Sequence, residues 1–199
     1  MGIKTAVFFV LPGYAEWESA YLASRLNRDE QWQVKTASLT AGVCESMGGF
    51  KTVVDYGLAD LPAQIDLLVL VGGTGWGIDS ADLNALIEQC LAQGTVVGAI
   101  CGAVDYLAKN GHLNQHQHTG NALFLWQGYE QYQNQAGFQA QQVVSDRRLV
   151  TANGTAAIAF SAEVLRLLKP EAAPHITSEH ALFQLGYYAY KDQYGDPYA

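Results

Sequence analysis

Apolar runs and amphipathic stretches alternate along most of the chain. Continuous apolar runs at 3–11, 66–73 and 95–100 predict strands that are buried on both faces, as in a parallel sheet. Apolar residues spaced three or four positions apart predict helices over four further stretches: 16–28, 81–94, 102–111 and 155–170. Strands that alternate with helices are typical of an α/β fold with a mainly parallel sheet.

Shorter patterns fill the gaps between these elements. Period-two alternation predicts a strand at 31–39, and a Gly-containing stretch at 46–58 predicts a hairpin or short edge strands. Residues 141–152 are expected to form two strands around a tight turn at Asp146 and Arg147. Aromatic residues at helical intervals predict a helix over 121–135.

The chain of 199 residues fits one domain, over 1–170, followed by a helical, aromatic tail over 171–199. A helix at 180–190 would present four side chains to a neighbour: Leu182, Leu185, Tyr188 and Tyr190. Such an apolar strip predicts contact with a second copy, and we therefore expect a homodimer. The alternative is that the strip packs on its own domain.

Composition and charge exclude several classes of protein. Hydrophobic residues make up 49% and charged residues 15%, and no apolar run is long enough to span a membrane, so we expect a soluble protein. We also expect the first apolar run to be a strand and not a signal peptide. The net charge of −8 argues against a nucleic-acid partner. Three cysteines without CxxC spacing or a set of His partners argue against a disulfide framework and against a metal site, and they favour a reducing cytoplasm.

One cysteine lies at a junction where chemistry is expected. In VVGAICGAVDYLAKNG, Cys101 follows a predicted strand and precedes a predicted helix. Ligands bind at this edge of a parallel sheet, and small neighbours such as Gly98 and Gly102 permit a sharp turn that thrusts the side chain into a cleft. We expect the helix N-terminus to lower the pKa of the Cys101 thiol. The alternative is a cysteine that fills space, which is our interpretation of Cys44 and Cys90.

Two other strand ends offer partners for Cys101. Glu16 and Glu18 follow the first strand, at the start of a predicted helix. A carboxylate there interacts favourably with the helix dipole. The alternative is that one of the two glutamates reaches the sulfur. An ionised carboxylate would oppose a thiolate, so the pair requires a protonated glutamate that donates a hydrogen bond or moves a proton. In VGGTGW, the backbone N–H of Gly73 is a candidate to polarise a bound carbonyl together with that of Gly102.

Taken together, the segments AEWE, VGGTGW, AICGA and TANGTAAIAFSAEVLRLL resemble the ThiJ/PfpI family, in the class I glutamine amidotransferase-like superfamily. The resemblance covers nearly all of residues 3–168. It implies a flavodoxin-like three-layer sandwich with a mainly parallel central sheet flanked by helices.

The resemblance also implies roles for individual residues. Cys101 matches the nucleophile-elbow cysteine, and Glu18 matches the acidic partner that hydrogen-bonds to it. Gly73 and Gly102 fall where the oxyanion-binding backbone lies. Glu16 matches a more variable acidic site.

Two departures from the family pattern concern histidine. The peptidase-like branch has a histidine directly after the cysteine, and this chain has Gly102 there. The deglycase and chaperone branch has a histidine in the segment that reads HQHTGNAL here, where Asn121 takes its place, and His116 and His118 are the nearby candidates. The substrate-pocket candidates are Glu16, Trp17, Trp76, His118, Thr119 and Asn121.

Three functions are consistent with this sequence. The first is a cofactor-independent cysteine hydrolase, or a glyoxalase- or deglycase-like lyase, that acts on a small carbonyl compound with Cys101 as nucleophile and Glu18 as proton carrier. The second is a redox sensor or stress-response protein in which an oxidant modifies Cys101. The third is a non-catalytic glutamine amidotransferase-like module that uses the cleft to bind a ligand.

Overall fold

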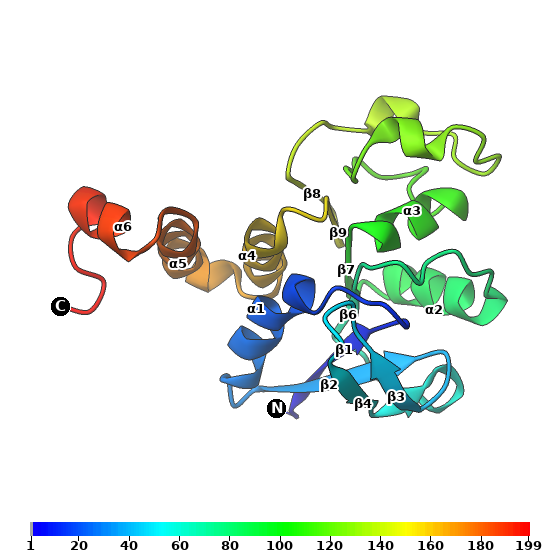
Figure 1. Cartoon of the computed structure of the whole chain (residues 1–199), viewed down its shortest axis with the longest axis horizontal. Helices are drawn as coiled ribbons and strands as arrows, with labels where there is room; N and C mark the ends of the chain where they lie inside the picture. The colour runs from blue at the N-terminus through cyan, green and yellow to red at the C-terminus, as the bar shows by residue number, and fades with distance from the viewer. Residues whose placement is uncertain (1) are drawn as a thin grey trace.

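A seven-stranded sheet forms the centre of the molecule (Figure 1). The computed structural model describes residues 2–199. The strands run across the sheet in this order: β5 (Tyr56–Gly57), β2 (Trp32–Ser38), β1 (Lys4–Phe9), β6 (Leu67–Leu70), β7 (Val96–Ile100), β9 (Leu149–Ala152) and β8 (Val143–Asp146). Neighbouring strands are parallel except β8, which pairs antiparallel with β9. The mainly parallel sheet that the apolar runs predict is confirmed.

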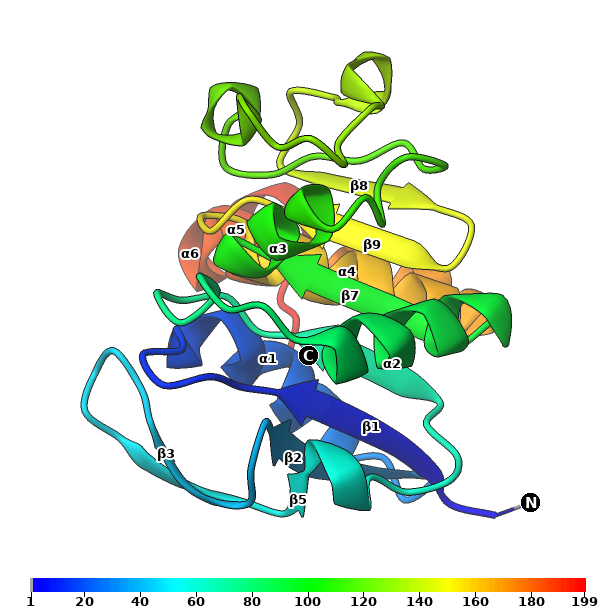
Figure 2. The same ribbon diagram turned by 90° about the vertical axis from the view of Figure 1, so that its right-hand side faces the viewer.

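Helices cover both faces of the sheet (Figures 1 and 2). Helices α1 (Glu16–Asn27) and α4 (Ala157–Leu168) pack on one face, and α2 (Ala81–Ala92) and α3 (Gly102–Lys109) pack on the other. The three-layer sandwich is therefore confirmed. Among residues 2–199, no helix combines the length and the apolar character needed to cross a membrane.

The apolar runs are continuous because alternate side chains enter two different cores. In β6, Leu67 and Val69 join the core under α1 and α4, whereas Leu68 and Leu70 join the core under α2 and α3. All four side chains are fully buried. A strand that faces helices on both sides has no solvent face, and its sequence therefore lacks polar alternation.

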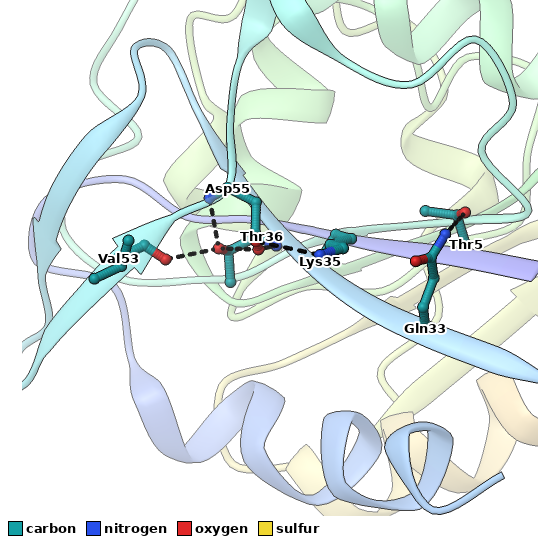
Figure 3. Close-up of polar contacts among 6 residues, drawn as sticks. All are labelled: Thr5, Gln33, Lys35, Thr36, Val53 and Asp55. Carbon is teal, nitrogen blue, oxygen red and sulfur yellow. Dashed lines mark hydrogen bonds and ion pairs between the residues drawn. The ribbon is translucent and has the colours of Figure 1, made fainter. Parts of the chain in front are cut away.

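The stretch at 46–58 contributes to a hairpin of β3 (Gly42–Glu45) and β4 (Lys51–Val54) at the sheet edge. Figure 3 shows how it is attached to β2. The Asp55 carboxylate accepts a hydrogen bond from the backbone N–H of Thr36 at 2.8 Å, and the Thr36 hydroxyl lies 3.0 Å from the Val53 carbonyl oxygen. Further along β2, the Gln33 side chain donates to the Thr5 hydroxyl of β1 at 2.9 Å. The Thr36 contacts hold the hairpin against β2, and the Gln33 contact joins β2 to β1.

The prediction of a helix over 121–135 is wrong. The structure has two short 3₁₀ turns instead, η2 (Leu123–Trp126) and η3 (Gln135–Gly137), in a segment that stands above α3 and β8 in Figure 2. The rings of Trp126 and Tyr132 both pack against His118 and against each other. They therefore form one aromatic cluster and do not line one face of a helix. Gly128 interrupts the path with a φ of 88°.

The tail forms two helices and not the single helix expected over 180–190. Helices α5 (Ala173–Leu185) and α6 (Tyr187–Tyr194) are separated by Gly186, whose φ of 78° is a left-handed conformation that favours glycine. Helix α5 packs beside α4, whereas Tyr188 is 81% exposed. Tyr190 is buried and does not face outward. The domain boundary at 170 and the homodimer stay predictions.

Candidate active site at the carboxyl ends of the strands

Cys101 occupies the sharp turn between β7 and α3. Its backbone has φ 58° and ψ −128°, a conformation that residues with a Cβ rarely adopt. The backbone is fixed on both sides: the Cys101 N–H donates to the Ala152 carbonyl of β9 at 3.0 Å, and the Cys101 carbonyl accepts from the Val104 N–H at 2.9 Å. The half-buried side chain therefore has its direction set by backbone bonds. The predicted elbow is present.

Glu18 lies in the first turn of α1 and faces the sulfur. The start of this helix is held against the end of β6 because the Ala15 N–H donates to the Gly72 carbonyl at 2.9 Å. Glu18 is only 2% exposed, and burial raises the pKa of its carboxyl to about 7, although hydrogen bonds with the Cys101 thiol and the Gly72 N–H oppose the shift. The carboxyl therefore keeps its proton to a higher pH than an ordinary glutamate does.

Asn121 also contacts the sulfur. Its Nδ2 lies 3.4 Å from Sγ of Cys101, and its Oδ1 accepts a hydrogen bond from the Gly154 N–H at 2.9 Å. The bond to Gly154 fixes the orientation of the amide, so the NH₂ end faces the thiol. Asn121 therefore lies where the resemblance placed it, next to the cysteine.

Sequence reasoning missed Gly154 as part of this site. A Cβ at Gly154 would lie 2.9 Å from Sγ of Cys101 and 3.2 Å from Oε1 of Glu18. Gly72 is equally restricted, because a Cβ there would lie 2.6 Å from the Cβ of Cys101 and 2.3 Å from Oε2 of Glu18. The only indication in the sequence is the position of Gly154 two residues after the end of a predicted strand, in TANGTAA. Both glycines leave room for the cysteine and the glutamate to meet.

The expected lowering of the Cys101 pKa is not what the structure supports. Burial raises the pKa of the Cys101 thiol, and the negative charge of Glu18 raises it further. The Asn121 amide and the Gly102 N–H lower it, but they do not compensate. Because a thiolate and a carboxylate in contact repel each other, the two groups share one proton instead of both ionising.

Gly73 and Gly102 lie side by side, and the oxyanion role of their N–H groups stays a prediction. A Cβ at Gly102 would lie 2.6 Å from the carbonyl oxygen of Gly73, and Gly73 has a φ of 135° that favours glycine. Trp76 packs beside them, largely buried, with its indole N–H donated to the Val71 carbonyl at 2.8 Å. Trp76 supports this loop while also lining a cavity beside it.

His118 and Thr119 have their polar groups engaged away from Cys101. His118 is fully buried, with Nε2 2.8 Å from the Tyr132 hydroxyl and Nδ1 2.8 Å from the His116 carbonyl oxygen. Burial lowers the pKa of the His118 imidazole. The Thr119 hydroxyl donates to the Gln141 carbonyl at 2.8 Å. Both residues therefore support the loop that carries Asn121.

Glu16 is held at the β3–β4 hairpin and not at the sulfur. The Gly48 N–H donates to Oε2 of Glu16 at 3.3 Å, which ties this carboxylate to the β3–β4 hairpin. Backbone hydrogen bonds, from its own N–H first and then from Gly48, lower the pKa of Glu16. Trp17 is 50% exposed. Of the two glutamates, only Glu18 meets the cysteine.

Two cavities flank the site. One has a volume of about 560 Å³ and is bordered by Asn121, Gln142 and Asn153. The other has a volume of about 340 Å³ and is bordered by Gly73 and Gly102. Within the described part of the chain, no group of three or more His, Cys, Asp and Glu side chains is arranged to hold a metal ion.

Comparison with known proteins finds matches over nearly the whole chain. The DJ-1/PfpI family model matches residues 4–167. The "Uncharacterized protease YdeA" of Bacillus subtilis is 43% identical over 196 residues, covering 98% of this chain and 99% of the relative. A thiJ/pfpI family protein from Bacillus anthracis superposes with a TM-score of 0.88 at 30% identity, covering 97% of each chain. A DJ-1 superfamily protein from Agrobacterium tumefaciens gives a TM-score of 0.80 at 32% identity, covering 88% of this chain and 96% of the other.

Proposed function

Because the chain belongs to the DJ-1/PfpI family, which the ThiJ/PfpI resemblance of its sequence predicted, we propose that it is a cofactor-independent cysteine enzyme that acts on small carbonyl compounds. One observation carries the proposal. The Cys101 thiol touches a carboxyl group, that of Glu18, whose pKa is raised to about 7. A general acid and base works best when its pKa is close to the operating pH.

The reaction begins with addition of the thiol to an aldehyde. The Cys101 sulfur bonds to the carbonyl carbon while its proton passes to Glu18, and the carbonyl oxygen takes up a proton to complete a hemithioacetal. In a 2-oxoaldehyde, Glu18, ionised again after passing its proton to that oxygen, removes the proton of C1 and a proton is delivered to C2. The proton of the C1 hydroxyl moves to the C2 oxygen, which leaves the thioester of a 2-hydroxy acid. Water hydrolyses the thioester, releases a 2-hydroxy acid and restores the thiol. The net change is the addition of one water molecule.

The groups around the sulfur divide this work. Asn121 donates to the sulfur and orients it, but an amide does not take up a proton at neutral pH, so proton transfer falls to Glu18. The N–H groups of Gly73 and Gly102 supply the hydrogen bonds that a developing oxyanion needs. Since the imidazole of His118 is engaged elsewhere, the arrangement favours carbonyl chemistry over the Cys-His chemistry of peptidases.

Turnover of methylglyoxal tests the proposal. We expect the purified protein to convert methylglyoxal to lactate, and we expect Cys101→Ala to abolish the conversion. Glu18→Gln should lower kcat by about a hundredfold or more, because it removes the proton carrier and leaves the sulfur in place. Cys90→Ala is the matched control, since Cys90 lies on the buried face of α2. Equal turnover by wild type and Cys101→Ala would refute the proposal.

A second candidate, a cysteine-based redox sensor, is favoured by the donors around the sulfur. The Asn121 amide, the Gly102 N–H and a protonated Glu18 are placed to hydrogen-bond to oxygens added to Cys101. A peroxide would supply each oxygen and be reduced to water or an alcohol. Mass spectrometry after mild peroxide treatment separates the two functions. Oxidation confined to Cys101, in a protein that does not turn over methylglyoxal, would support the sensor.

A further inference from the structure

The larger cavity beside the cysteine exceeds the needs of a three-carbon substrate. Its volume is about 560 Å³, within the range of roughly 300–1,000 Å³ typical of small-molecule sites. It reaches the immediate surroundings of Sγ through Asn121, which borders the cavity and contacts the sulfur at 3.4 Å. A carbonyl group held at Cys101 can therefore extend past Asn121 into this space.

Apart from Thr119, the polar side chains that border the cavity are amides. The Asn153 oxygen accepts from the backbone N–H of Thr155 at 3.0 Å and from its hydroxyl at 2.6 Å, so the NH₂ end of Asn153 is not engaged by Thr155. Gln142 contacts the same hydroxyl through one end of its amide, at 3.1 Å, which leaves the other end available. Amides offer donors and acceptors side by side, and this matches hydroxyl groups on adjacent carbons.

The remaining walls are uncharged. Phe138 and Leu123 provide apolar surface, and no side chain that borders this cavity carries a formal charge. The other cavity beside Cys101 differs, because Asp105 and Lys109 border it. A cavity without a cation, in a protein of net charge −8, has nothing to neutralise an anionic group.

We propose that the active site prefers carbonyl compounds with an uncharged, polyhydroxylated tail, and that the cavity bordered by Asn121, Gln142 and Asn153 binds the tail. The inference rests on the proposed function, because it assumes that the reacting carbonyl lies at Cys101. Hydroxyl groups of the tail bond to the amides of Gln142 and Asn153. The C–H faces of the tail pack on Phe138.

Two 2-oxoaldehydes with the same reacting end test the preference. Methylglyoxal has no tail, and 3-deoxyglucosone has an uncharged polyhydroxylated one. We expect kcat/KM for 3-deoxyglucosone to exceed that for methylglyoxal by about tenfold, the effect of one or two hydrogen bonds. Gln142→Glu keeps the contact with Thr155 but introduces a carboxylate, so the ratio of the two kcat/KM values should fall roughly fivefold to tenfold. Gln89→Glu makes the same chemical change in a separate cavity beneath α2 and should leave the ratio unchanged.

A binding measurement separates failure of this inference from failure of the proposed function. Sorbitol carries the hydroxyl groups but has no carbonyl, and its addition should shift the side-chain amide resonances of Gln142 and Asn153 in wild type. If neither 2-oxoaldehyde is turned over and sorbitol still shifts these resonances, the proposed reaction fails and the cavity assignment stands. Three results would each overturn the inference. The first is a higher kcat/KM for methylglyoxal in wild type, and the second is a ratio of kcat/KM values that Gln142→Glu leaves unchanged. The third is that sorbitol shifts neither of the two amide resonances.

Discussion

The backbone of Cys101 should store measurable strain, and two substitutions isolate it. Cys101→Ala removes the sulfur but keeps a Cβ at φ 58° and ψ −128°. Cys101→Gly removes the sulfur and the Cβ together, and glycine adopts this conformation without steric cost. Both variants lose the contacts that Sγ makes with Asn121 and Glu18. The difference in their free energies of unfolding therefore reports mainly the conformation of residue 101.

The expected difference follows from two opposing terms. A residue with a Cβ held in such a conformation costs about 1–3 kcal/mol. Glycine loses about 0.4–1 kcal/mol relative to alanine, because it makes the unfolded chain more flexible. The net effect favours Cys101→Gly by up to about 2.6 kcal/mol, with a central value of about 1.3 kcal/mol. In a chain of this length, each kcal/mol raises Tm by about 2–4 °C.

Urea denaturation of the two variants, followed by circular dichroism, measures the difference. We expect a higher midpoint for Cys101→Gly with an unchanged slope, since the surface exposed on unfolding is nearly the same. Ala108→Gly is a useful comparison, because residue 108 lies within α3 and glycine should destabilise the protein there. A Cys101→Gly variant that is less stable than Cys101→Ala would refute the account of a strained elbow.

Three further predictions follow from the same structure. The pKa of Glu18 is raised from 4.5 to about 7 on folding, so wild type should lose stability relative to Glu18→Gln as pH rises from about 5 to about 8. Thermal unfolding measures this loss. A stability difference between the two proteins that stays constant with pH would contradict the raised pKa. Gly154→Ala should slow alkylation of Cys101 by iodoacetamide by roughly tenfold or more, because the new Cβ would lie 2.9 Å from Sγ. Gly77→Ala is the control and should leave the rate unchanged, because a Cβ at Gly77 would have no atom within 4 Å. His118→Ala should destabilise the protein by about 2–4 kcal/mol in urea without changing the alkylation rate, and a slower rate would place His118 in the site.

Much of the fold could be predicted because burial leaves a clear pattern. Strand β6 reads as a continuous apolar run because helices cover both its faces, and the residues around Cys101 are small because the turn is sharp. The segment 121–135 misled the prediction for a related reason. Its aromatic residues recur at helical intervals, but they gather around the buried His118 and not along one helix. Periodicity does not distinguish these two kinds of burial.

The site was only partly predictable, because its electrostatics depend on distances. Motifs at separate strand ends pointed to Cys101 and to Glu16 or Glu18, since parallel strands bring their carboxyl ends to one edge, and the family resemblance selected Glu18. Gly154 was missed because a glycine in a turn is common and only its distance to Sγ shows its role. The pKa of Cys101 was expected to be lowered, because the helix N-terminus is visible in a sequence and the burial of a thiol against a carboxyl is not.

Carbon-13 NMR of the Glu18 side-chain carboxyl, followed from pH 4 to pH 9, tests the central claim most directly. The claim is that Cys101 lies beside a carboxyl group that is still partly protonated near neutral pH. We predict that the Glu18 resonance titrates with a midpoint at about 7 and that the midpoint shifts in Cys101→Ala, because the two groups share a proton. A midpoint at the ordinary value of 4.5, unchanged when the sulfur is removed, would contradict the account.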